Sequence, residues 1–108
     1  MKTKAPKKNT VLESTRSKKI VKWINTLPGF KAVKRHQAGW NRKGDPDITG
    51  CGGPSGRRFE LETKQPGEGP TPLQEIRLRE WSEAGAVTGV VREVEDARRI
   101  FVANGLLQ

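Results

Sequence analysis

The sequence predicts an α/β domain, with a central mixed sheet of four strands and helices packed on it. Three observations lead to this fold class. Apolar residues recur at helical spacing near both ends of the chain, polar and apolar residues alternate from Arg58 to Lys64, and a glycine-rich stretch precedes that alternation. The expected order of elements is α-β-β-β-α-β-α.

A helix is expected from Val11 to Thr26. Ile20, Trp23 and Ile24 recur at the spacing of one helix face, which indicates a face that packs on a core. The segment Leu27-Pro28-Gly29 then ends the helix, because proline cannot continue the backbone hydrogen bonds.

The ten residues before this helix hold four lysines and almost nothing apolar. Such a composition buries too little apolar surface to offset the entropy lost on ordering, so residues 1–10 are expected to be a disordered basic tail. With 108 residues in all, the chain has room for a single domain, expected over residues 11–108.

A hairpin is expected in the middle of the chain, with strands at Pro46–Thr49 and Arg57–Gln65. If Gly50 faces Phe59 across this hairpin, the same register places Asp47 opposite Glu62. Neighbouring strands lie roughly 4.8 Å apart, so both carboxylates would reach one small site. The remaining expected elements are strands at Lys31–Ala38 and Ala86–Arg92, and helices from Pro72 to about Ala84 and from Glu95 to Asn104.

Two acids and a lysine at this register suit a metal-dependent phosphodiesterase. Mg2+ and Mn2+ favour carboxylate and carbonyl oxygens, so Asp47, Glu62 and the backbone carbonyl of Thr63 are candidate ligands. Such an ion activates a water, and Lys64 adds a point charge near the phosphate. A solvated strand face with cross-strand ion pairs is the alternative interpretation of the same acids.

Positive charge is concentrated in the first part of the chain. Residues 1–43 hold thirteen Lys and Arg against one acid, whereas residues 44–108 hold eight against eleven, which together give the net charge of +9. A basic surface of this kind favours nucleic acid as the partner, although a solvated basic face remains the alternative. The candidate nucleic-acid-binding residues are Arg35, His36, Trp40, Arg42 and Lys43.

Other partners and locations are less favoured by the sequence. It has no run of eighteen apolar residues and no apolar signal core at its N-terminus, so no membrane association is expected, and the protein is expected to be intracellular rather than secreted. The lone Cys51 has no partner for an internal disulfide.

Two motifs in this order resemble those of the PD-(D/E)xK nuclease superfamily, and more closely its VRR-NUC branch. That branch pairs G-x-P-D, here Gly44 to Asp47, with E-x-K, here Glu62 to Lys64, and then a glutamine on a helix, here Gln74. The resemblance spans residues 13 to about 101. It implies a restriction-endonuclease-like αβββαβ core, to which this chain would add a C-terminal helix.

The resemblance also implies roles for individual residues. Asp47 and Glu62 become metal ligands, Lys64 the catalytic cation, and Glu13 an acid that completes the site through a bound water. Glu13 is equally well explained as an acid favoured by the helix dipole. Gln74 fits a capping box with Thr71, so its role in the site and its role in the helix cap both remain open.

The expected function is therefore a Mg2+- or Mn2+-dependent DNA endonuclease with no small-molecule substrate. By analogy with VRR-NUC proteins of similar size, the expected substrate is branched DNA such as a Holliday junction, cut by a homodimer in replication, repair or recombination in the cytoplasm of a bacterial or phage-infected cell. The rivals are a nonenzymatic nucleic-acid-binding module and an interaction protein, such as a phage-type inhibitor with a basic tail.

Overall fold

The computed structural model describes residues 4–35 and 42–108, and within the first helix it describes side chains from Glu13 onward. The predicted order of elements is confirmed. The elements are α1 (Lys4–Ile24), β1 (Lys31–Lys34), β2 (Ile48–Gly52), β3 (Arg57–Thr63), α2 (Pro72–Glu83), β4 (Val87–Val91) and α3 (Val94–Ala103).

The strands form one mixed sheet in the order β1-β2-β3-β4. The first three strands are antiparallel neighbours, whereas β4 runs parallel to β3 after the crossover through α2. Gly50 pairs with Phe59 and Ile48 pairs with Leu61. The predicted hairpin register is therefore confirmed, and Asp47, one residue before Ile48, continues it toward Glu62.

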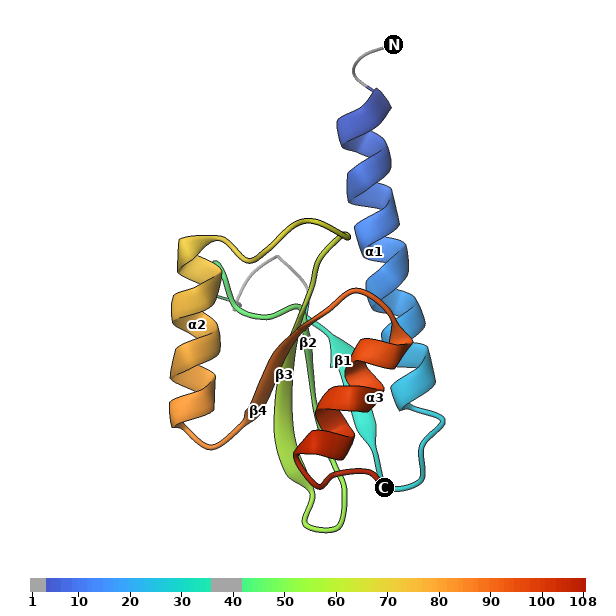
Figure 1. The fold of residues 1–108 in the computed structure, drawn as a ribbon, viewed down its shortest axis with the longest axis vertical. Coiled ribbons are helices and arrows are strands. Elements are labelled where there is room, and N and C mark those ends of the chain that lie inside the picture. Colours follow the sequence, from blue (N-terminus) through green and yellow to red (C-terminus); the bar gives the residue numbers. More distant parts are fainter. Residues whose placement is uncertain (1–3, 36–41) are drawn as a thin grey trace.

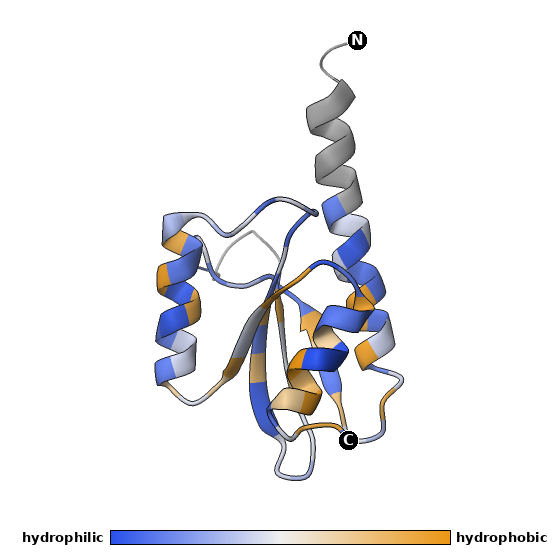
Figure 2. Cartoon of the chain, viewed as in Figure 1, coloured by the Kyte–Doolittle hydropathy of each residue, from blue (hydrophilic) through white to orange (hydrophobic). Residues whose placement is uncertain are grey.

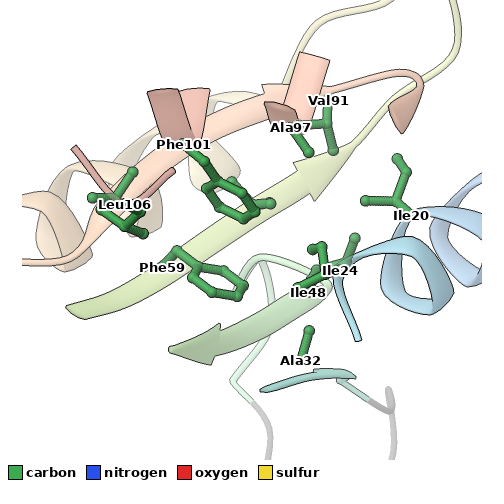
Figure 3. Close-up of a cluster of buried hydrophobic side chains, with 11 residues drawn as sticks. Ile20, Ile24, Ala32, Ile48, Phe59, Val91, Ala97, Phe101 and Leu106 are labelled. Carbon is green, nitrogen blue, oxygen red and sulfur yellow. The ribbon is translucent and has the colours of Figure 1, made fainter. Parts of the chain in front are cut away.

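Helices cover both faces of the sheet (Figure 1): α1 and α3 lie against one face, and α2 lies on the other. The core fills the space between the sheet, α1 and α3 (Figure 3), where the rings of Phe59 and Phe101 are 4.9 Å apart between centroids. The opposite layer is more polar, because α2 is mostly hydrophilic (Figure 2) and buries none of its residues fully. The site described below uses both layers.

Helix α1 starts earlier than the sequence predicts. Residues 4–10 are helical, although a disordered tail was expected for residues 1–10. Lysine and alanine are good helix formers, and extending an existing helix avoids the cost of a new nucleus. Pro6 lies in the first turn, where its missing N–H costs no helical hydrogen bond.

All four strands differ from the prediction at one or both ends: β3 ends at Thr63 rather than at Gln65, and β4 runs from Val87 to Val91 rather than from Ala86 to Arg92. Strand β1 ends at Lys34 rather than at Ala38, and residues 36–38 of the predicted strand lie outside the described residues. Strand β2 runs from Ile48 to Gly52 rather than from Pro46 to Thr49. Pro46 lacks the N–H that a strand ladder needs, and the pairing with β1 and β3 continues through Gly52.

The charged face of β3 is not solvated, unlike the strand face in the alternative interpretation of these acids. Glu60 has no exposed surface and Glu62 has 6%, and Phe59, Leu61 and Thr63 on the other face are fully buried. The reason is position: β3 lies between β2 and β4 in the sheet, and helices cover both of its faces. The acids of β3 are therefore buried polar groups that require partners.

Candidate active site

A pocket of about 350 Å³ lies beside the C-terminal end of β3, between α1 and the start of α2. It contains all five residues that the sequence predicts as catalytic. They come from four segments of the chain: the first helix, the start of the hairpin, its second strand and the following helix. The lining residues are Glu13, Lys43, Gly44, Asp45, Asp47, Glu62, Lys64, Thr71, Leu73 and Gln74.

The carboxylate of Asp47 is held from both sides. The hydroxyl of Ser17 on α1 donates to its Oδ2 at 3.0 Å, and the backbone N–H of Thr63 on β3 donates to its Oδ1 at 2.9 Å. Burial raises the pKa of Asp47, while these two hydrogen bonds oppose the rise by stabilising the charged form. The side chain is thus fixed in orientation before any ligand binds.

The carboxylate of Glu62 is only half satisfied. Its Oε2 accepts a hydrogen bond from the Gln74 amide at 3.1 Å, whereas its buried Oε1 has no hydrogen-bond partner among the described residues. Burial raises the pKa of Glu62 to about 8; Asp47 adds to the rise, and Lys64 opposes it. A buried carboxylate oxygen without a hydrogen-bond partner costs stability, and a bound cation would offset this cost.

Gln74 makes hydrogen bonds both in the helix cap and in the pocket. Its backbone N–H donates to Thr71 Oγ1 at 3.2 Å, and its side-chain oxygen accepts from the Thr71 N–H at 2.9 Å, which completes the capping box. Because its oxygen is committed to the helix cap, its NH2 group points to Glu62. The cap therefore orients the amide in the site.

Glu13 and Lys64 complete the charged lining. Burial raises the pKa of Glu13, Lys64 opposes that rise, and Asp47 adds to it. The helix-dipole interpretation of Glu13 is wrong, because α1 begins at Lys4 and has no acid in its first turn. Lys64 is the cation that counters both Glu13 and Glu62.

The donors in the pocket fit a hard divalent cation that keeps several waters. Asp47 and Glu62 supply oxygens, and Glu62 Oε1 is free of hydrogen bonds within the part of the chain that the structure describes. The Thr63 N–H points to Asp47, and in an extended strand the carbonyl of the same residue points to the same side. A group of three or more His, Cys, Asp or Glu side chains that alone could hold a metal is not present among the described residues. A backbone carbonyl and waters would therefore complete the set.

The predicted nucleic-acid-binding residues have different environments. Arg35 is not available to a phosphate, contrary to the prediction, because its side chain is 13% exposed and donates to Glu60 and to the Pro46 carbonyl. Arg42 is half exposed and pairs with Asp45 and Glu80, and Lys43 lines the pocket. His36 and Trp40 lie outside the described residues.

Sequence reasoning missed three contributors to this region. Ser17 lies one turn after Glu13 on the same helix face, a spacing that was a usable signal. Glu60 and Trp81 have no local sequence pattern that marks them. Glu60 is joined to the site by its ion pair with Arg35, and the Trp81 indole N–H donates to Asp45 Oδ1 at 3.1 Å. Both contacts link segments distant in sequence.

The sheet order, the helix placement and the pocket at the end of the central hairpin define a restriction-endonuclease-like α/β core. Among solved structures, the chain is similar to one described as a VRR_NUC domain, with a TM-score of 0.65 and 21% sequence identity over 84% of this chain and 95% of that chain. The fold is thus that of a VRR-NUC domain, as the sequence resemblance implies. No protein-family model matches the sequence, and no curated protein matches it.

Within the described residues, none of the helices has the length and apolar character needed to cross a membrane.

Proposed function

We propose that this protein is a divalent-metal-dependent DNA endonuclease that hydrolyses phosphodiester bonds at the pocket beside β3. One observation carries the proposal: Asp47, Glu62 and Lys64 line the same pocket, and Glu62 keeps a buried oxygen with no hydrogen-bond partner among the described residues. A purely structural set of acids would be paired, because an unsatisfied buried carboxylate oxygen costs stability.

Asp47, Glu62 and the Thr63 carbonyl would hold Mg2+ or Mn2+. Bound there, the ion would supply positive charge to the phosphate and make a water more acidic. The protein's own contribution is orientation: Ser17 and the Thr63 N–H fix Asp47, and Gln74 fixes one oxygen of Glu62. Preorganised ligands of this kind need no rearrangement when substrate arrives.

Lys64 is the group we assign to the reacting phosphate. Its ammonium is a compact point charge on the pocket wall, suited to stabilise the charge that builds on the phosphate during attack by water. Glu13 faces the same space from α1 and would orient a water. Lys43 lines the pocket from the opposite segment and would contact a neighbouring phosphate.

The finer part of the proposal is that the substrate is branched DNA and that two copies act together. Its support is the concentration of positive charge in residues 1–43 and the small body, whose extents are 49 × 26 × 26 Å. Because so small a surface contacts few bases, the protein would recognise the shape of the DNA rather than a long base sequence. A two-fold pair would present one pocket to each of two strands.

The central experiment compares the parent with Glu62→Ala and Lys64→Ala on plasmid, fork and four-way-junction DNA, in Mg2+, Mn2+ or chelator. Each variant should cut at least about 100-fold more slowly, because each removes a group that stabilises the transition state. Glu83→Ala, an exposed acid at the end of α2, is the matched control and should cut like the parent. Parent-like cleavage by both site variants would refute the assignment.

A nonenzymatic nucleic-acid-binding module is the rival function. It is favoured by the same basic segment and predicts DNA binding that is unchanged by chelator, with no cleavage in either metal. The cleavage experiment separates the two, and the mass of the parent measured by light scattering tests the proposed dimer.

A further inference from the structure

A buried polar cluster lies beside the pocket, on the face of the sheet that α2 covers. At its centre is Glu60, which has no exposed surface. Its Oε1 accepts from Arg35 at 2.7 Å, and its Oε2 accepts from Arg58 at 2.9 Å and from Thr49 at 2.5 Å. The ring of Trp81 lies 5.6 Å from the Arg35 guanidinium and 4.6 Å from that of Arg58, whose side chain is 52% exposed.

Arg35 connects this cluster to the backbone that carries Asp47. The guanidinium donates to the Pro46 carbonyl at 2.6 Å, and the backbone N–H of Arg35 donates to the Asp47 carbonyl at 2.7 Å. These two oxygens belong to the peptide groups on either side of the Asp47 Cα. One residue thus holds both peptide planes from which the Asp47 side chain projects.

Stability alone does not account for such a cluster. Removing two charges from water is expensive, and replacing a buried ion pair with neutral groups is often neutral or stabilising. The site, however, requires accuracy, because a metal ligand must lie within a few tenths of an ångström of its place. The cluster is suited to that need, since a planar guanidinium holds two acceptors in a fixed geometry.

We infer that Arg35 and Glu60 are positioning residues for Asp47, and that their purpose is to fix this ligand for a divalent cation. The inference rests on the proposed function. Arg35 touches neither metal nor substrate: it acts through the Pro46 and Asp47 carbonyls, and Glu60 acts by holding Arg35.

The test measures Mn2+ affinity by titration calorimetry, with the metal alone, and the thermal unfolding temperature in chelator. The variants are Arg35→Met and the double variant Arg35→Met/Glu60→Gln. Arg99→Met is the matched control, because Arg99 pairs with Asp96 on α3 and is 66% exposed. It should bind Mn2+ like the parent.

Arg35→Met should lower the unfolding temperature, because Glu60 loses a buried partner. It should also weaken Mn2+ binding about 10- to 100-fold, the usual effect of losing a group that orients a ligand. The double variant should recover stability, since Glu60 no longer carries a buried charge that has lost Arg35, but should keep the weak Mn2+ binding. If the Arg35–Glu60 pair has only a structural role, the double variant should recover both the unfolding temperature and the Mn2+ affinity.

Parent-like Mn2+ affinity in either folded variant would overturn the inference. If Arg35→Met does not fold, the double variant decides alone, and Arg35→Lys, which keeps a cation beside Glu60, provides a second folded form that should still bind Mn2+ more weakly. Measurements on the parent separate this inference from the proposed function. A parent that binds Mn2+ but cuts no DNA contradicts the nuclease proposal. The ratio of the Mn2+ affinities of variant and parent then still tests the positioning role.

Discussion

At the scale of single residues, the site is a set of buried and half-buried carboxylates that differ in their hydrogen bonding. Asp47 has a hydrogen bond on each oxygen, whereas Glu62 has one on Oε2 and none on Oε1 within the described residues. Burial raises the pKa of Asp47, Glu62 and Glu13, and repulsion from Asp47 adds to the rise at Glu62 and at Glu13. With a pKa of about 8, Glu62 holds a proton at neutral pH, and a cation bound to its carboxylate would displace that proton.

The raised pKa of Glu62 makes the stability of the folded protein depend on pH. The pKa of Glu62 is about 8 in the folded protein and 4.5 without the fold, so between these values the folded state holds a proton that the unfolded state lacks. Stability in chelator should therefore fall as pH rises from about 5 to 8. Relative to Glu62→Gln, which cannot ionise, the parent should lose at least about 4 °C in thermal unfolding.

If the proposed metal site is correct, Mg2+ should reverse this trend, because it would bind the deprotonated carboxylate and stabilise the folded state more at pH 8 than at pH 5. The same unfolding measurements with saturating Mg2+ check it. Equal slopes with pH for parent and Glu62→Gln would contradict the raised pKa, and equal Mg2+ effects at both pH values would contradict metal binding by Glu62.

At the scale of elements, the segment before β2 is placed by its contact with α2. Gly44 has φ +85°, in the left-handed region that favours glycine, and a Cβ there would lie 2.7 Å from Leu73 Cγ on α2. The close approach lets the segment that leads to Asp47 pass beneath the N-terminal turn of α2, where Gln74 meets Glu62. Glycine is therefore a requirement of the site's architecture.

Gly44→Ala should destabilise the protein by about 1–3 kcal/mol and weaken Mg2+-dependent cleavage, because it adds backbone strain and pushes α2 away. Gly56→Ala is the control: its φ is +67°, but a Cβ there would meet nothing within 4 Å. It should cost less stability and leave cleavage unchanged. Thermal unfolding and cleavage rates of the two variants check this; equal losses in both would contradict a role for the contact with Leu73.

At the scale of the whole molecule, positive charge is spread along α1, where Lys18, Lys19 and Lys22 are exposed. The helix extends beyond the rest of the protein at its N-terminal end (Figure 1). In the proposed function, this long basic helix on a protein of net charge +9 would provide an electrostatic surface for the phosphate backbone, independent of base sequence.

DNA affinity should therefore fall at least about tenfold between 50 and 200 mM salt, through loss of the entropy of counterion release. Fluorescence anisotropy with Glu62→Ala in chelator measures binding without cleavage. The logarithm of affinity should decline linearly with the logarithm of salt concentration. Affinity that does not respond to salt would contradict a binding mode based on phosphate contacts.

The sequence by itself determined the order and type of the elements and the pairing that brings Asp47 toward Glu62. These features follow from local patterns: helical spacing of apolar residues, strand alternation, and a glycine-rich hairpin whose register fixes its partners. The capping box at Thr71 and Gln74 is equally local. The order of the motifs, Gly44 to Asp47, then Glu62 to Lys64, then Gln74, can also be found in the sequence, and it is the basis of the resemblance that implies the fold.

Only the tertiary structure decided which charges are buried and what holds them. The Arg35–Glu60 pair spans 25 positions in sequence, and the hydrogen bond from Ser17 to Asp47 spans 30. No short-range pattern distinguishes a solvated Glu60 from one enclosed by two arginines and Trp81. Whether a polar side chain is exposed depends on which elements pack over it, and that is a property of the assembled layers rather than of the strand that carries it.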